Sequence, residues 1–413
     1  MNVDFQRWVD RYAGGVICRL LSWYHGLRRA PQLPTKPRKI LVVLISEMGS
    51  LVLAYPMFRD LRKTYPEAEL YTLMFAKNRE VLEIMDVTSP ENILTIRDTG
   101  LFTLLSDIVS VLRTLRRLRI DIVIDCELFS RISSILSFLS GAPVRVGFHP
   151  HTQEGLYRGS FINRPVMYNP YNHIAKQFLT LAAAIASDAV PHSKVDVSFQ
   201  NLDPPRLAFS GEARDRMQAR LNRDFPGIVD KPLVLMYPGG GILPIRAWPL
   251  ENFTWIAQQL AGEGYAVAIV GLVSDRKLAQ TIQHEVREGV CIDLTGYTRS
   301  LRELILVFQF AALLITNDGG PGQFAAMTPM PSIIFYGPET PVLYGPVDPK
   351  ATVFFDPLPC TPCLSAYNHR RSPCDGNNMC LKRIAPELVL AKVREVLKRP
   401  PNAEPAAGEG IEA

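Results

Sequence analysis

The sequence contains no run of 18 apolar residues, and it does not open on the charged, apolar and small-residue regions that together form a secretory signal peptide. The first absence argues against a membrane-spanning helix, and the second leads us to expect a cytoplasmic protein. With 413 residues, 47% of them hydrophobic and 21% charged, the chain is long enough for two ordinary domains and too apolar to be disordered.

The chain also lacks an excess of positive charge over most of its length. The formal net charge is +5 at pH 7, and residues 1–38 alone hold seven arginine and lysine side chains against two aspartates. The remainder is therefore neutral. Nucleic-acid-binding proteins more often spread basic side chains over a folded face, so we predict no nucleic-acid partner.

Cysteine is scarce except in one segment. Cys18, Cys126 and Cys291 stand alone among apolar residues and are predicted to be inert core thiols. The other four follow the pattern Cys-x2-Cys-x10-Cys-x5-Cys and are Cys360, Cys363, Cys374 and Cys380. Four such thiolates can hold a structural zinc ion, and an iron–sulfur cluster fits the same ligand count. Four reduced thiols in the loop 360–380 are the alternative.

Residues 3–27 place aromatic and aliphatic side chains at three- and four-residue spacing, with arginines between them. The spacing predicts an amphipathic helix. Its Trp- and Tyr-rich stripe is typical of a helix that lies in a membrane interface, whereas Gly14 and Gly15 would each weaken an isolated helix by about 1 kcal/mol. The alternative is a helix packed on its own domain or on a second subunit. Three prolines mark a stiff linker that ends the segment 1–37.

Apolar runs of strand length then alternate with helical stretches, which predicts parallel sheets covered on both faces. The alternation fades across 200–230, which is rich in Pro, Asp and Arg, and then resumes. The predicted strands are 40–45, 70–75, 120–125, 144–148, 233–237, 266–271, 313–316 and 332–336. We therefore predict an α/β protein of two Rossmann-like domains, 38–205 and 206–399, that face a central ligand-binding cleft. The tail 400–413 is predicted to be disordered.

Two glycine turns are candidates for binding phosphate. Asn317-Asp318-Gly319-Gly320-Pro321 ends one strand and precedes a helical stretch, so free N–H groups at a helix start can bind an anion. In this turn Asp318 positions a divalent ion or a sugar hydroxyl, or serves only as a helix cap.

The second turn, Pro238-Gly239-Gly240-Gly241, follows another strand and precedes Arg246. Its glycines allow close backbone approach, and Arg246 offers a planar guanidinium for a diphosphate. A third turn, at 337–341, follows the strand at 332–336 and should lie on the same edge of the sheet.

The set of motifs resembles glycosyltransferase family 9, the heptosyltransferase-like enzymes of lipopolysaccharide assembly. The resemblance spans about residues 38–398 and rests on Ile40–Ser50, Tyr237–Trp248, Asp293–Gly296, Thr316–Met327 and Phe335–Pro338. It implies a GT-B fold with an N-terminal acceptor domain and a C-terminal nucleotide-sugar domain. It also implies inversion at the anomeric carbon, no obligatory metal, and an ADP-heptose-like donor. Cysteine-rich segments similar to 360–380 occur in some members of the family.

The sequence departs from the family pattern in three places. The family usually has Gly-Asp in the first N-terminal loop, where the Asp is thought to deprotonate the acceptor, and this chain has Gly49-Ser50. Serine cannot act as that base at neutral pH, so we assign the role to Glu47, with Asp125 or Glu127 as the alternatives. An arginine replaces the usual lysine at 246, and a glutamine replaces the usual histidine at 323.

We therefore expect a glycosyltransferase that moves a sugar from a nucleoside diphosphate to a glycan or glycolipid hydroxyl at the inner membrane surface, with residues 3–27 as a candidate membrane contact. The predicted donor-binding residues are Gly239, Gly240, Arg246, Asn317, Gly319, Gly320 and Gln323, and Asp318 joins Glu47 as a catalytic residue. An anionic lipid-linked acceptor would favour Arg131, Arg145, Arg158 and Arg164, which a solvated face explains equally well. The alternatives are a non-catalytic nucleotide-sugar-binding or assembly protein, and an epimerase or hydrolase on the same scaffold.

Overall fold

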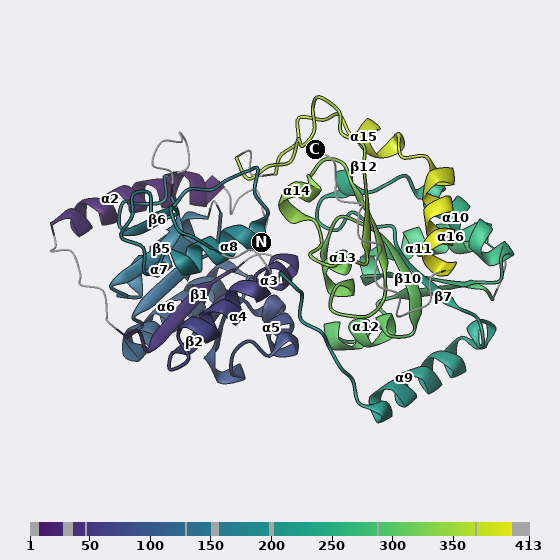
Figure 1. Ribbon diagram of the computed structural model, residues 1–413, viewed down its shortest axis with the longest axis horizontal. Coiled ribbons are helices and arrows are strands. Elements are labelled where there is room, and N and C mark those ends of the chain that lie inside the picture. Colours follow the sequence, from purple (N-terminus) through teal and green to yellow (C-terminus); the bar gives the residue numbers. More distant parts are fainter. Residues whose placement is uncertain are drawn as a thin grey trace. The chain divides into compact units, whose positions relative to one another are not determined.

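The computed structural model describes residues 8–27, 36–45, 48–128, 130–149, 157–197, 202–286, 289–367 and 370–398. The chain divides into two compact units, Met1–Leu202 and Asp203–Ala413. Each has its own sheet (Figure 1) and its own apolar core. The tail 400–413 and most of the linker before residue 37 lie outside the described residues. Within the described part, no helix combines the length and apolar character needed to cross a membrane.

The first unit contains a sheet of six parallel strands in the order β3-β2-β1-β4-β5-β6. The strands are β1 (Lys39–Val43), β2 (Glu69–Phe75), β3 (Ile93–Ile96), β4 (Ile122–Asp125), β5 (Val144–Phe148) and β6 (Arg164–Val166). This is the Rossmann order. Strands β1 to β3 follow one another outward from the centre of the sheet, and β4 to β6 follow outward on the other side, so the strand order reverses between β1 and β4. That reversal is the topological switch point, where ligands bind at the strand carboxyl ends.

Helices cover this first sheet and exclude water from its apolar strands. They are α3 (Met48–Leu53), α4 (Tyr55–Thr64), α5 (Arg79–Met85), α6 (Leu101–Leu118), α7 (Arg131–Leu139) and α8 (Ile174–Ala183). Helix α6 packs Val111 and Leu115 on the side chains of β1, β2 and β4. The other face of α6 is exposed and partly apolar, and its first turn carries Phe102 with 89% of its surface accessible.

The N-terminal helical segment packs on the first unit through one face only. It is described from Trp8 and comprises η1 (Asp10–Gly14), a π-helical turn, and α2 (Gly15–Gly26); Figure 1 shows α2 in purple beside α7. Cys18 is fully buried against Ile135 and Phe161. The backbone at Gly14 lies so near α7 that an added Cβ would come within 3.0 Å of the Arg131 Cβ. The glycine that weakens an isolated helix thus allows this close contact.

The second unit repeats the same topology. Its six parallel strands have the order β12-β11-β10-β7-β8-β9, which places the switch point between β7 and β10. The strands are β7 (Leu233–Tyr237), β8 (Ala266–Gly271), β9 (Cys291–Thr295), β10 (Ala311–Asn317), β11 (Ser332–Tyr336) and β12 (Ala351–Phe355). The prediction of two Rossmann-like domains is therefore confirmed.

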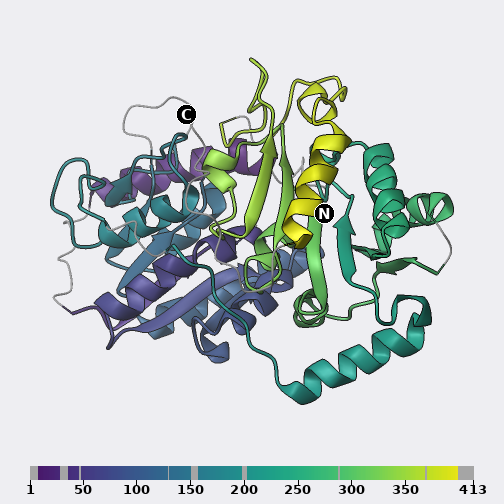
Figure 2. The ribbon, with the colours of Figure 1, turned by 45° about the vertical axis from the view of Figure 1, so that its right-hand side comes forward.

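Helices α10, α11 and α16 share one apolar core with this second sheet, in which the Trp248 ring stacks on Phe335 with centroids 4.3 Å apart. The helices of the unit are α9 (Gly211–Asp224), α10 (Leu250–Gly262), α11 (Arg276–Glu285), α12 (Leu301–Phe308), α13 (Gly320–Ala325), α14 (Pro341–Tyr344), α15 (Met379–Lys382) and α16 (Pro386–Lys398). Helix α9 falls in the stretch where the sequence pattern fades, because only Met217 and Leu221 of it are buried. Figure 2 shows it apart from the sheet.

Candidate functional site

The candidate site of the second unit lies at its switch point, where the turns after β7 and β10 meet. Asn317 joins them: its side-chain N–H groups donate to the carbonyls of Pro238 (2.9 Å) and Gly239 (3.1 Å), and its carbonyl oxygen accepts from the Trp248 N–H (2.9 Å). The side chain is fully buried. All of its polar atoms thus bind backbone, so Asn317 fixes the two turns relative to each other and can influence a ligand only through their positions.

Arg246 presents the charge of this site. It ends the short helix η5 (Pro244–Arg246), and its side chain is only 13% exposed. One guanidinium N–H donates to the Glu339 carboxylate at 2.7 Å, and another nitrogen lies 3.5 Å from a carboxylate oxygen of Asp318. Its Nε has no hydrogen-bond partner among the residues that the structure describes. A cation held in this way, with a buried N–H to spare, can bind a ligand oxyanion.

Glu339 is a site residue to which the sequence analysis gave no role. It follows β11, the neighbour of β10, and is 3% exposed. Besides Arg246 it has Arg370 nearby, with Nε 3.8 Å from its carboxylate. Burial, together with the negative charges of Asp318 and Glu339, raises the pKa of Tyr336 well above its ordinary value. In the sequence, Glu339 is visible as a carboxylate in a turn after an inner strand. Only the order of the strands in the sheet shows that this turn lies beside Arg246.

The glycines of the two turns have different roles. An added Cβ on Gly240 would come within 2.7 Å of the Leu243 carbonyl, so this turn can fold only with glycine. A Cβ on Gly239 would lie 3.1 Å from the Tyr237 ring. At Gly319 the nearest atom would be a Pro321 carbon at 3.9 Å, so space remains open beside this backbone.

Helix α13 begins at Gly320 and has only six residues. Its dipole is correspondingly small, and its anion-binding capacity rests on the first N–H groups, which have no partner within the helix. Gln323 on α13 is 4% exposed and donates from its amide nitrogen to the Tyr344 carbonyl at 2.9 Å. Its amide oxygen has no donor among the described residues, so it can accept a hydrogen bond from a ligand hydroxyl.

The switch point of the first unit is held by two carboxylates at the end of β4. The Ile45 N–H donates to Glu127 at 2.6 Å, and the Glu127 N–H donates to Asp125 at 3.1 Å. Glu127 is partly exposed, whereas Asp125 is 1% exposed and forms an ion pair with Arg158. This pairing makes Asp125 unavailable as an acceptor base. Glu47 lies outside the described residues, and its assignment stays a prediction.

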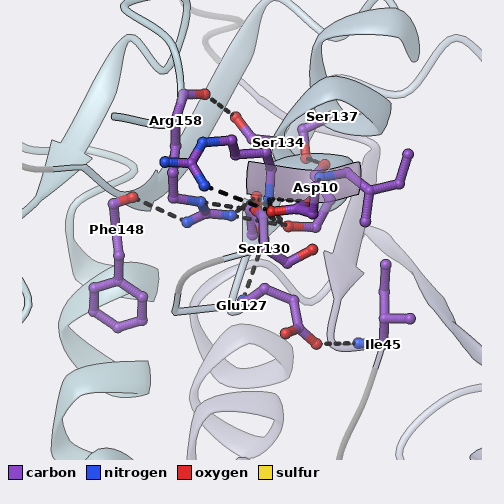
Figure 3. Close-up of polar contacts among 12 residues, drawn as sticks. Asp10, Ile45, Glu127, Ser130, Ser134, Ser137, Phe148 and Arg158 are labelled. Carbon is purple, nitrogen blue, oxygen red and sulfur yellow. Dashed lines mark hydrogen bonds and ion pairs between the residues drawn. The ribbon is translucent and has the colours of Figure 1, made fainter. Parts of the chain in front are cut away.

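Arg158 is enclosed by the first unit. Figure 3 shows its guanidinium donating to the carbonyls of Ser130 (3.0 Å) and Phe148 (2.9 Å). The Ser133 hydroxyl lies 2.9 Å from the same group and donates to Asp125. The other three arginines proposed for an anionic acceptor are buried as well: Arg131, Arg145 and Arg164. They do not form a solvated face, because they are buried and each donates an N–H to a carbonyl or carboxylate of the same unit.

The three isolated cysteines are buried, as predicted. Burial raises the pKa of Cys18 to about 11 and that of Cys291 to about 12, so both remain protonated thiols at neutral pH. Burial also raises the pKa of Cys126 well above its ordinary value.

The other four cysteines differ in environment: Cys360 and Cys374 are exposed, Cys363 is intermediate and Cys380 is buried. Within the described ranges, no three His, Cys, Asp or Glu side chains are placed to hold a metal ion. Cys363 instead accepts a hydrogen bond from Ser372 at 3.1 Å. The assignment of all four cysteines as metal ligands stays a prediction.

Comparison with known proteins places the chain in a family. Residues 108–372 match the model described as glycosyltransferase family 9 (heptosyltransferase). Lipopolysaccharide heptosyltransferase 2 of Salmonella typhimurium is 23% identical over 364 residues, which cover 87% of this chain and 98% of that protein. The solved structure of E. coli ADP-heptose lipopolysaccharide heptosyltransferase II matches with a TM-score of 0.67 and 22% identity, and covers 87% of this chain and 98% of its own.

The topology and these matches define a glycosyltransferase of the GT-B class, as the sequence predicted. More narrowly, the chain belongs to glycosyltransferase family 9, the heptosyltransferase family. The same fold occurs in the iron-containing dodecameric glycosyltransferase TibC of enterotoxigenic E. coli, with a TM-score of 0.51 and 13% identity over 88% of this chain and 77% of that one.

Proposed function

We propose that this glycosyltransferase moves a heptose or a related sugar from an ADP-linked donor to a hydroxyl of the lipid-linked core of a lipopolysaccharide, with inversion at the anomeric carbon. The observation that carries the proposal is Arg246, a nearly buried guanidinium fixed by two carboxylates at the switch point of the second sheet. The related Salmonella and E. coli proteins are named as lipopolysaccharide heptosyltransferases, which supports the donor and the acceptor class.

The chemistry follows from the charge that the leaving diphosphate develops. Arg246 and the backbone N–H groups of Gly319 and Gly320 stabilise that charge, because preorganised donors cost no reorganisation during the reaction. Asp318, whose pairing with Arg246 sets the orientation of the guanidinium, and Gln323 orient the donor sugar. Gly239 and Gly240 form the opposite turn of the diphosphate site, and Asn317 maintains the spacing between the turns. We propose no step through a metal ion.

The acceptor hydroxyl must lose a proton as it attacks the anomeric carbon. We keep Glu47 as the proposed base, because it follows β1 closely in the sequence, and β1 lies at the switch point of the first sheet. Glu127 is the alternative: Ile45 fixes one of its carboxylate oxygens, and the side chain is partly exposed. In either case the base comes from the carboxyl edge of the first sheet, where ligands bind in folds of this order.

Turnover of the donor tests this function directly. With ADP-heptose and a deep-core lipopolysaccharide acceptor, we expect ADP release that depends on the acceptor, together with a heptosylated product of the corresponding mass. ADP-heptose binding without release of ADP would favour the nucleotide-sugar-binding alternative. Release or epimerisation in the absence of acceptor would favour the hydrolase or epimerase alternative.

The N-terminal helical segment supports a site of action at the membrane surface. The face opposite its packed residues is apolar and open to solvent, with exposures of 55–70%. Its residues are Trp8, Tyr12, Val16, Leu20, Trp23 and Leu27. A stripe of Trp, Tyr and Leu on a helix from a segment of net charge +5 suits an anionic lipid surface. We therefore propose that this face, the exposed helix face, binds the membrane.

Vesicle binding tests the exposed helix face. The double substitution Leu20→Ser and Trp23→Ser should weaken flotation with vesicles of phosphatidylethanolamine and phosphatidylglycerol at least tenfold, because each buried apolar side chain contributes about 1.5–3 kcal/mol. Leu388→Ser is the matched control, since Leu388 is 66% exposed on α16 of the second unit. Equal losses in both variants would contradict the assignment. Deletion of the whole segment is a poorer test, because it would uncover the apolar contacts of Ile135 and Phe161.

A further inference from the structure

An apolar pocket of about 250 Å³ lies in the first unit between the N-terminal helical segment and α6. Ala13 and Ile17 line it from the N-terminal side, and Leu104 and Ile108 line it from α6. We call it the N-terminal pocket. An apolar cavity of on the order of 150 Å³ is already large enough to bind a small hydrocarbon, so this pocket has room for a larger apolar ligand.

The only charged side chain among the lining residues is Asp10, and it is already engaged. Its carboxylate accepts hydrogen bonds from the backbone N–H groups of Arg131 (2.9 Å) and Ile132 (2.9 Å) at the start of α7. It also pairs with the Arg131 guanidinium at 3.7 Å. A polar ligand would therefore find little to bind in this pocket, and a hydrocarbon chain meets no unsatisfied charge there.

The position of the N-terminal pocket connects it with the acceptor. Three of its lining residues, Ile45, Phe75 and Ile96, stand at the carboxyl ends of β1, β2 and β3. Ile45 is also the residue whose N–H binds Glu127, the alternative acceptor base. A ligand in the pocket is therefore next to the edge of the sheet where the acceptor hydroxyl is deprotonated in the proposed function.

The rim of the pocket continues the apolar surface. Leu101 and Leu105 line the pocket and are half exposed, and Phe102 beside them is 89% exposed. On the other side, Val9 and Ile17 connect the rim with the exposed helix face. An apolar path therefore runs from the proposed membrane contact into the pocket and on to the acceptor edge.

We propose that the N-terminal pocket binds one fatty acyl chain of the lipid-linked acceptor. This inference rests on the proposed function, because it gives the acceptor its lipid. The headgroup glycan would extend from the pocket over the carboxyl edge of β1, while the remaining acyl chains stay in the bilayer. The pocket would thus select acceptors that still carry their lipid.

Binding of simple fatty acids tests the pocket without any need for turnover. Below its critical micelle concentration, dodecanoate should bind the full-length protein at least about 100-fold more tightly than butanoate, since each buried methylene adds roughly fourfold in affinity. Ala13→Trp, which fills the pocket from an exposed position, should abolish this preference. Leu388→Trp is the control, because Leu388 is 66% exposed on α16, does not line the pocket and is not part of the exposed helix face.

Transfer assays separate the possible sources of the chain. Ala13→Trp should raise KM for the acylated acceptor at least tenfold and leave KM for the deacylated acceptor and flotation with phosphatidylglycerol vesicles unchanged. Loss of flotation in Ala13→Trp but not in Leu388→Trp would mean that the pocket holds a bilayer lipid, and would overturn the proposal. So would a change of mass in solution that shows a second copy of the chain covering the pocket. If no acceptor is glycosylated while dodecanoate still binds, the proposed function fails and the pocket stands as an acyl site without that acceptor.

Discussion

Arg246→Ala is expected to lower kcat/KM for sugar transfer by roughly 10³-fold, because one preorganised donor to a developing charge contributes about two to three orders of magnitude. Arg246→Lys should recover part of the rate, since it keeps the charge that the family's usual lysine supplies but loses the planar fork that contacts Glu339. Steady-state kinetics with ADP-heptose and acceptor, and ADP affinity by calorimetry, measure the two effects separately.

Arg246→Ala should also destabilise the folded protein, so the loss of transfer has to be distinguished from a loss of folded enzyme. Glu339 is 3% exposed and depends on Arg246 for its closest ion pair. Loss of the Arg246 guanidinium removes this ion pair from a buried carboxylate, whose contact with the Arg370 Nε is longer at 3.8 Å, at a cost of up to about 3–5 kcal/mol in stability. Adding Glu339→Gln to Arg246→Ala removes that charge and should restore stability without restoring transfer. Recovery of transfer in the double variant would contradict the role of Arg246 in donor binding.

Arg158→Met should lower the free energy of unfolding of the protein by about 3–5 kcal/mol, the effect of leaving a buried partner charge uncompensated. Arg158 and Asp125 have side-chain exposures of 1% and 2%, so water cannot replace the lost pairing. Burial already raises the pKa of Asp125, and Arg158 opposes that rise. In the variant the folded-state pKa rises further, so the folded protein binds a proton more readily than the unfolded chain. The stability deficit should therefore shrink as pH falls.

Urea unfolding of the variant and wild type at several pH values measures this effect. Combining Arg158→Met with Asp125→Asn should return most of the lost stability, because no buried charge remains. Arg97→Met is the matched control: Arg97 pairs with Asp107 at 2.8 Å, but its side chain is 59% exposed, and such pairs contribute little. A deficit that is the same at every pH, or equal in the control, would contradict the buried-charge explanation.

The sequence predicted the inner strands of both sheets and missed all four edge strands. An inner strand of a parallel sheet is covered on both faces and paired on both sides, so its residues form the continuous apolar runs seen at β1 or β7. An edge strand is paired on one side only and tolerates polar residues and proline. Accordingly, β6 contains Arg164 and Pro165, β9 contains Asp293, and every residue of β12 is partly exposed.

The candidate site was predictable where a residue type and its turn suffice, and not where the partner comes from another strand. Arg246 and the Asn317 turn are visible as a guanidinium and a glycine turn after apolar runs. The pairing of Arg246 with Glu339 depends on β11 lying beside β10, which the sequence does not state. For the same reason Arg158 looked like an acceptor contact, because its partner Asp125 is 33 residues away along the chain.

The hydrogen bonds of Asp10 to the start of α7 have a consequence for the geometry of catalysis. Helix α7 follows β4, so these hydrogen bonds connect the N-terminal helical segment to the sheet edge that carries Glu127. If the exposed helix face lies on a flat bilayer, this connection fixes the distance between the lipid headgroups and an acceptor hydroxyl that can bind at the sheet edge. The enzyme would then select acceptors by the distance of the hydroxyl from the membrane. It would glycosylate a core oligosaccharide of one length and leave unmodified a longer one whose next hydroxyl is farther from the headgroups.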